Sequence, residues 1–291
     1  MKELNGIGVA LVTPFQENGQ IDFDSLEKLV KHVKDDVHFL VVMGTTGEAS
    51  TLSEEERLSV LDFVLQVNSG QLPVVFGMGG NDTALLASQL ESFDRVGVSA
   101  FLIASPSYNK PTQEGIYRHY SVLSENSPLP IILYNVPSRT GSNVLPKTVV
   151  RIARDTENVV AIKEAAADIS QVMELSAKLP EGFALLSGDD PLLLPHLACG
   201  GDGLISVAAN AFPKNFREIY DACLSGDFEL ARKEQFKMST FISEIFAEGN
   251  PAGIKSALKY LGICENHFRL PLYPVSDTQE QKIIVATSSL Q

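Results

Sequence analysis

Eight short apolar runs recur along the chain, and a longer amphipathic segment follows each of them. Most of these runs are apolar throughout, as is typical of parallel strands that are covered on both faces. Regular strand and helix units predict a parallel α/β fold, and eight units favour a closed barrel over an open doubly wound sheet. The predicted strands are residues 7–11, 39–43, 74–76, 101–104, 131–134, 159–162, 183–186 and 204–207.

Helix start signals precede several of the amphipathic segments. Residues 22–34 place their apolar side chains on one stripe, and Ser53 followed by Glu56 matches a capping box. Further helix starts are predicted at Asp82, Thr112 and Pro213.

The pattern changes after about residue 225. Residues 227–247 and 251–261 read as helices, and only the weak apolar run 283–286 suggests another strand. One barrel usually takes about 250 residues, so a barrel with a short appendix fits the length, although two ordinary domains would fit it too. We therefore expect a (β/α)8 TIM barrel in residues 1–224 and a C-terminal helical region in residues 225–291.

The chain is strongly acidic, with 23 Lys and Arg against 36 Asp and Glu and a formal charge of −13. Such a surface repels nucleic acid and anionic lipid, so small molecules and copies of the chain are the expected partners. No run approaches the roughly 20 apolar residues of a membrane helix, and the N-terminus shows no secretory signal.

The cysteines, Cys199, Cys223 and Cys264, are few, odd in number and never at CxxC spacing. This argues against a disulfide framework and a zinc knuckle, and it favours a reducing cytoplasm. The histidines show no HxH or HExxH spacing, so no metal site is expected.

Polar and reactive residues directly follow the predicted strands, and in barrels the active site lies at these strand ends. Lys163 is the sharpest example, because it ends a buried apolar strand. Burial disfavours the ammonium form, and a neutral amine can condense with a ketone to give an imine. The alternative is a lysine that extends to the rim or pairs with a carboxylate.

Five other residues carry similar alternatives. Thr45 and Thr46 lie in a Gly-flanked turn that could hold a carboxylate, or simply cap a helix. Tyr134 could relay a proton or fill the core, and Arg139 could bind a carboxylate or form a surface ion pair. Tyr108 lies in a Pro-bounded loop, as a lid, an interface residue or a surface aromatic.

The glycine-rich residues 77–81 and the aspartate pair at 189 and 190 have structural interpretations that need no ligand. Residues 77–81 lack the lysine of a P-loop and the spacing of a dinucleotide fingerprint, so close packing explains their glycines better. Asp189 and Asp190 are interpreted as a helix start, where negative charge is favourable.

Six motifs, in order, resemble the 4-hydroxy-tetrahydrodipicolinate synthase (dihydrodipicolinate synthase) family, within the superfamily that includes N-acetylneuraminate lyase. The resemblance runs from about residue 6 to residue 274. The motifs are GTTGE at 44–48, YNKPTQEG at 108–115, YNVPSRTG at 134–141, IKEA at 162–165, LLSGDD at 185–190 and ISV at 205–207.

The resemblance implies a lyase in which Lys163 forms a Schiff base with pyruvate. Thr45, Tyr134 and Tyr108 resemble the proton-relay triad of the family, with Tyr108 reaching into the site of a neighbouring subunit. Thr45 and Thr46 resemble the pair that holds the pyruvate carboxylate.

The resemblance also implies that Arg139 meets the carboxylate of L-aspartate 4-semialdehyde and that Gly188 and Ile205 line the site through their main chains. The product would be 4-hydroxy-tetrahydrodipicolinate, in the diaminopimelate and lysine biosynthesis pathway. No cofactor is implied, and the implied assembly is a homotetramer built from tight dimers.

Two other functions stay open from the residues alone. One is a sibling aldolase that acts on a sugar acid or another aldehyde, and the other is a catalytically silent barrel that binds a small acid. The double threonine and Arg139 favour the synthase over sugar-acid lyases, whereas the intact set of Lys163, Tyr134 and Thr45 argues against a silent barrel.

This sequence differs from the family at the pocket where lysine-sensitive members bind lysine as an inhibitor. Leu85 replaces a carboxylate and Ser107 replaces an aromatic wall, so weak or absent inhibition by lysine is expected. The matching positions are Ala49, Glu54, Arg57, Asn81, Leu85 and Ser107, of which only Asn81 keeps the sensitive pattern.

Overall fold

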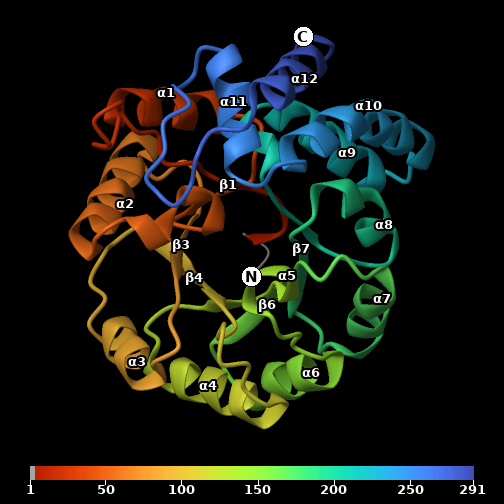
Figure 1. The fold of residues 1–291 in the computed structure, drawn as a ribbon. Coiled ribbons are helices and arrows are strands. Elements are labelled where there is room, and N and C mark those ends of the chain that lie inside the picture. The colour runs from red at the N-terminus through yellow and green to blue at the C-terminus, as the bar shows by residue number, and fades with distance from the viewer. Residues whose placement is uncertain (1–3) are drawn as a thin grey trace.

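A computed structural model describes residues 4–291 and contains a closed barrel of eight parallel strands (Figure 1). The strands pair in chain order, and the last pairs with the first. The predicted α/β fold, a (β/α)8 barrel, is confirmed. The strands are β1 (Gly6–Ala10), β2 (Phe39–Val42), β3 (Val74–Met78), β4 (Val98–Ala104), β5 (Ile131–Asn135), β6 (Val159–Glu164), β7 (Ala184–Ser187) and β8 (Gly203–Ser206).

Helices surround the barrel as a ring, seen along the barrel axis in Figure 1. The side chain of Asp22 caps one of them, and Ser53 and Glu56 form the predicted capping box. Asp82, Thr112 and Pro213 also stand at the predicted helix starts. The helices are α1 (Phe23–Val33), α2 (Glu54–Asn68), α3 (Thr83–Glu91), α4 (Gln113–Asn126), α5 (Pro137–Thr140), α6 (Pro146–Asp155), α7 (Ile169–Lys178), α8 (Leu193–Ala198) and α9 (Pro213–Leu224).

Three further helices, α10 (Phe228–Phe246), α11 (Ala252–Tyr260) and α12 (Asp277–Ser288), pack against one another and against α9 (Figure 1). The weak strand suggested for residues 283–286 is wrong, because α12 contains them. The Ser276 side chain caps this helix, and Ile283 and Thr287 turn one face inward at helical spacing.

Two apolar layers divide the core. The larger one joins the outer faces of the strands to the helices, and the smaller one fills the barrel interior. The interior cluster includes Phe39, Leu102, Tyr134, Leu186 and Ile205. Within residues 4–291, no helix has the length and hydropathy that a bilayer crossing requires.

Gly77 shows why the end of β3 carries a glycine. A Cβ atom there would lie 2.1 Å from the carbonyl oxygen of Met43. The obstacle is backbone of the neighbouring strand end, so no side-chain rotation can relieve it. Close packing, as the sequence predicts, explains this glycine.

We therefore expect Gly77→Ala to lower the free energy of unfolding by about 1–3 kcal/mol, the usual cost of overpacking. Gly79→Ala is the matched control, because a Cβ at Gly79 would meet nothing within 4 Å. Urea unfolding of both variants measures the difference, and equal stabilities would contradict this account of Gly77.

Candidate active site

Lys163 lies on the inner face of the barrel. Side chains alternate along a strand, so Ala161 and Lys163 face the interior, while Ile162 and Glu164 face the helices. The Lys163 side chain is buried, with only 6% of its residue surface exposed. The strand therefore holds an amine inside the mouth of the barrel, as the sequence predicts.

Tyr134 is the neighbour of Lys163 on the adjacent strand. The two residues are in register across β5 and β6, and Lys163 Nζ lies 4.4 Å from the centre of the Tyr134 ring. Gly188 leaves space for the lysine, because a Cβ there would approach Lys163 Cε to 2.9 Å. Ile205 belongs to the same interior cluster as Tyr134 and is fully buried.

Glu164 anchors the end of β6 from the opposite face. Its buried carboxylate accepts hydrogen bonds from Asn135 Nδ2 at 3.0 Å, from Gln171 Nε2 at 2.9 Å and from the Ala166 amide at 2.8 Å. Burial raises the pKa of Glu164, and these hydrogen bonds oppose the increase. These hydrogen bonds hold the end of β6, which carries Lys163, in one orientation.

Asp189 and Asp190 do more than begin a helix. Asp189 accepts a hydrogen bond from the Ala167 amide, and burial raises its pKa against the opposing charge of Lys163. Asp189 is the N-cap residue of η4 (Asp190–Leu192), which leads directly into α8, so both residues stand at a helix start as the sequence predicts.

The carboxylate of Asp190 is fully buried and ties β7 to the end of β8. It accepts hydrogen bonds from the Ser206 hydroxyl and from the amides of Val207 and Ala208. Burial raises the pKa of Asp190 to about 6, and the hydrogen bonds and the charge of Lys163 oppose this increase. The helix-start interpretation of this residue missed that link.

The threonine pair occupies a short helical turn, η2 (Thr45–Gly47), at the end of β2. Thr45 is exposed at the mouth, whereas Thr46 is 2% exposed and its Oγ1 accepts a hydrogen bond from Asn250 Nδ2 at 3.0 Å. Thr13 Oγ1 donates to the Gly47 carbonyl oxygen at 2.7 Å and holds the turn from the other side.

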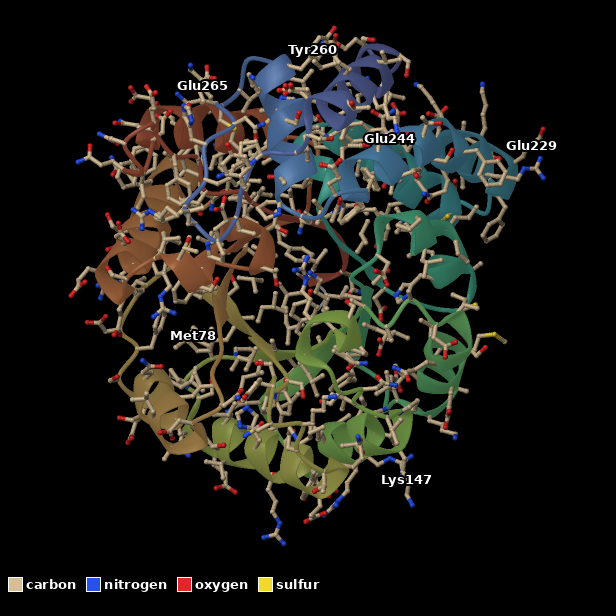
Figure 2. All side chains as sticks on the ribbon, in the orientation of Figure 1. Met78, Lys147, Glu229, Glu244, Tyr260 and Glu265 are labelled. Carbon is tan, nitrogen blue, oxygen red and sulfur yellow. The ribbon has the colours of Figure 1, made fainter. Side chains whose placement is uncertain are left out.

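A cavity of about 550 Å³ opens at this end of the barrel. Thr45, Tyr134 and Arg139 line it together, and Met78 contributes the wall at the end of β3. Figure 2 labels Met78 on the inner side of the helix ring, whereas Lys147 and Glu229 extend outward at its edge. Lys163 is not among the residues that line the cavity, but its neighbour Tyr134 is.

Two of the predicted site residues, Arg139 and Tyr108, have exposed side chains on segments that follow the strands. Arg139 is exposed on α5, and its Nη2 lies 3.5 Å from the carbonyl oxygen of Asn250. Tyr108 is 92% exposed and does not line the cavity of its own chain. Asn81 fixes the loop before it by bonding both the amide and the carbonyl of Ser107.

The positions matched to the lysine pocket lie beside the same cavity. Ala49, Arg57, Asn81 and Ser107 line it, whereas Glu54 lines a smaller neighbouring pocket together with Arg57. Leu85 is 58% exposed and presents no charge.

Several contacts at the mouth escaped the sequence analysis. Asn250, in the segment between α10 and α11, meets both Thr46 and Arg139. Glu48 and Lys255 form a fully buried ion pair at 2.5 Å. The one signal for this pair was a lysine within the small and apolar residues 252–258, which the sequence analysis did not single out.

The arrangement combines a buried amine, a phenol and a hydroxyl-bearing turn. It suits imine chemistry on a small keto acid, with an arginine at the entrance for a second carboxylate. In residues 4–291, no group of three or more His, Cys, Asp or Glu side chains is placed to hold a metal ion.

Comparison with known proteins agrees with this chemistry. Residues 3–289 match the model of the dihydrodipicolinate synthetase family. The 4-hydroxy-tetrahydrodipicolinate synthase of Flavobacterium psychrophilum is 44% identical over 100% of this chain and 99% of its own.

Solved structures are equally similar. The dihydrodipicolinate synthase of Thermotoga maritima has a TM-score of 0.95 at 40% identity, covering 98% of this chain and 97% of its own. The enzyme of Cyanidioschyzon merolae with lysine bound has a TM-score of 0.95 at 32% identity, covering 99% and 98%. The chain therefore belongs to the dihydrodipicolinate synthetase family.

Proposed function

We propose that this chain condenses pyruvate with L-aspartate 4-semialdehyde to give 4-hydroxy-tetrahydrodipicolinate, in the diaminopimelate and lysine biosynthesis pathway. The observation that carries the proposal is the buried Lys163 amine, which lies 4.4 Å from the Tyr134 ring at the mouth of the barrel. The enzyme is a Schiff-base lyase, similar in chemistry to class I aldolases.

The reaction begins when the Lys163 amine attacks C2 of pyruvate and water leaves. The resulting imine withdraws electrons, so loss of a methyl proton gives an enamine. Tyr134 and Thr45, with Tyr108 of a second subunit, are the proposed relay for these protons. Thr45 and Thr46 bind the carboxylate of pyruvate.

The enamine carbon then attacks the aldehyde carbon of the semialdehyde and forms the new carbon–carbon bond. Arg139 binds the carboxylate of this second substrate, and the main chains of Gly188 and Ile205 line the site. The amino group of the semialdehyde finally displaces Lys163 from the imine carbon. This closes the ring and frees the enzyme without a cofactor.

The exposure of Tyr108 supports the proposal that the enzyme is an oligomer. Its 92% exposed ring does not line the cavity of its own chain, so a catalytic role requires a partner subunit. We propose a homotetramer made of two tight dimers, each of which exchanges Tyr108. The acidic surface and the three free cysteines suit a cytoplasmic enzyme without nucleic-acid or membrane partners.

The function is tested by coupling the protein to a dihydrodipicolinate reductase. We expect turnover with pyruvate and L-aspartate 4-semialdehyde, and a pyruvate adduct on Lys163 after borohydride reduction. Lys163→Ala should lose both turnover and adduct with its circular dichroism spectrum unchanged, because it removes only the nucleophile. Adduct formation without turnover of this semialdehyde would instead indicate a sibling aldolase.

Tyr108→Phe should lower kcat at least tenfold while KM for pyruvate changes little, since the variant loses a proton carrier but no pyruvate contact. A positioned proton-transfer group contributes about 100- to 10,000-fold. Steady-state kinetics measures both constants, and Tyr117→Phe is the control on an outer helix. Normal turnover in Tyr108→Phe would remove Tyr108 from the relay.

Lysine should inhibit weakly or not at all. Leu85 offers no carboxylate to a lysine ammonium, and the Asn81 side chain is occupied by Ser107. Losing one charge-assisted contact costs about 1.5–3 kcal/mol, or roughly ten- to hundredfold in affinity. Titrating lysine into the coupled assay tests this, and half-inhibition at micromolar lysine would contradict it.

A further inference from the structure

The buried pair Glu48–Lys255 joins the C-terminal helices to the turn that carries the threonines. Glu48 directly follows η2 and has a left-handed backbone conformation, with φ +56°. Lys255 lies in the first turn of α11, and its Nζ donates to Glu48 Oε1 at 2.5 Å. Both side chains have 0% exposure.

Lys255 is held firmly on its own side of this contact. Its Nζ also donates to the carbonyl oxygen of His267 at 2.8 Å, and it lies 4.5 Å from the Phe15 ring and 4.6 Å from the Phe268 ring. Aromatic faces attract a cation at such distances. These contacts hold the ammonium group in place, and the ammonium in turn fixes the position of the Glu48 carboxylate.

Glu48 is less well satisfied. Its second oxygen, Oε2, is buried without a hydrogen-bond partner within residues 4–291. Burial raises the pKa of Glu48 and lowers that of Lys255, so each needs the other to keep its charge. A buried pair of this kind is weak as a source of stability, and such pairs can instead define a particular geometry.

A second link runs in parallel with the first. Asn250, just before α11, donates from Nδ2 to Thr46 Oγ1 at 3.0 Å, and its carbonyl oxygen faces Arg139. The start of α11 thus contacts the turn at two points, Thr46 and Glu48. Thr46 is one of the two proposed carboxylate-binding threonines, and Glu48 lies two residues after it.

We infer that Lys255 is a positioning residue, which acts through Glu48 to hold Thr45 and Thr46 in the geometry that receives the carboxylate of pyruvate. The C-terminal helices are then part of the catalytic apparatus and more than a cover for the barrel. The inference rests on the proposed function, because it needs pyruvate as the ligand of the turn.

The experiment separates positioning from stability. Lys255→Met leaves a buried carboxylate alone and should lower Tm. Glu48→Gln/Lys255→Met removes both charges at similar volume and should recover much of that Tm, as in other buried pairs. The double variant should nevertheless lose about ten- to hundredfold in kcat/KM for pyruvate, because small misplacements of binding groups are costly.

Lys259→Met/Glu280→Gln is the matched control, since that pair links the same helix to α12 at the surface. It should keep the wild-type kcat/KM for pyruvate. KM for the semialdehyde should stay near the wild-type value in both double variants.

Recovery of both Tm and kcat/KM in Glu48→Gln/Lys255→Met would overturn the inference and leave the pair a purely structural one. If the double variant does not fold, Glu48→Gln decides, because it keeps the volume and removes the carboxylate charge that holds Glu48 against Lys255. A wild-type KM for pyruvate in Glu48→Gln would also overturn the inference. Failure of the wild-type protein to form the borohydride adduct would instead reject the proposed function.

Discussion

The alternation of side chains along β6 is the constraint on which the site depends. It turns Lys163 into the barrel and Glu164 toward the helices, so one residue faces the barrel interior while the next anchors the strand. Barrel closure places the ends of β2 and β5 around the same mouth. A shift of one residue in β6 would bury a carboxylate where the amine now lies.

Buried hydrogen bonds fix the strand ends around Lys163. Glu164 binds Asn135 and Gln171, and Asp190 binds the end of β8. Gly188 keeps the space beside the lysine open. Such preorganisation matters for a nucleophile that must form and break an imine in every turnover.

The eight strands and the convergence of Tyr134, Thr45 and Arg139 on one mouth could be predicted, because both follow from local apolar runs and from the parallel fold. The Glu48–Lys255 pair could not, since it joins residues 207 positions apart and depends on how α11 packs. The run 283–286 in α12 suggests a strand from sequence alone, because four consecutive apolar residues fit a strand and a buried helix equally well. The proposed catalytic role of Tyr108 could not be tested on one chain, because it requires the site of a second subunit.

A crystal structure of the wild-type protein soaked with pyruvate tests the central claim most directly. We expect continuous density between Lys163 Nζ and C2 of pyruvate, with the carboxylate bound by Thr45 and Thr46. Pyruvate bound without a covalent link to Lys163, or a Lys163 side chain directed away from the barrel mouth, would contradict it.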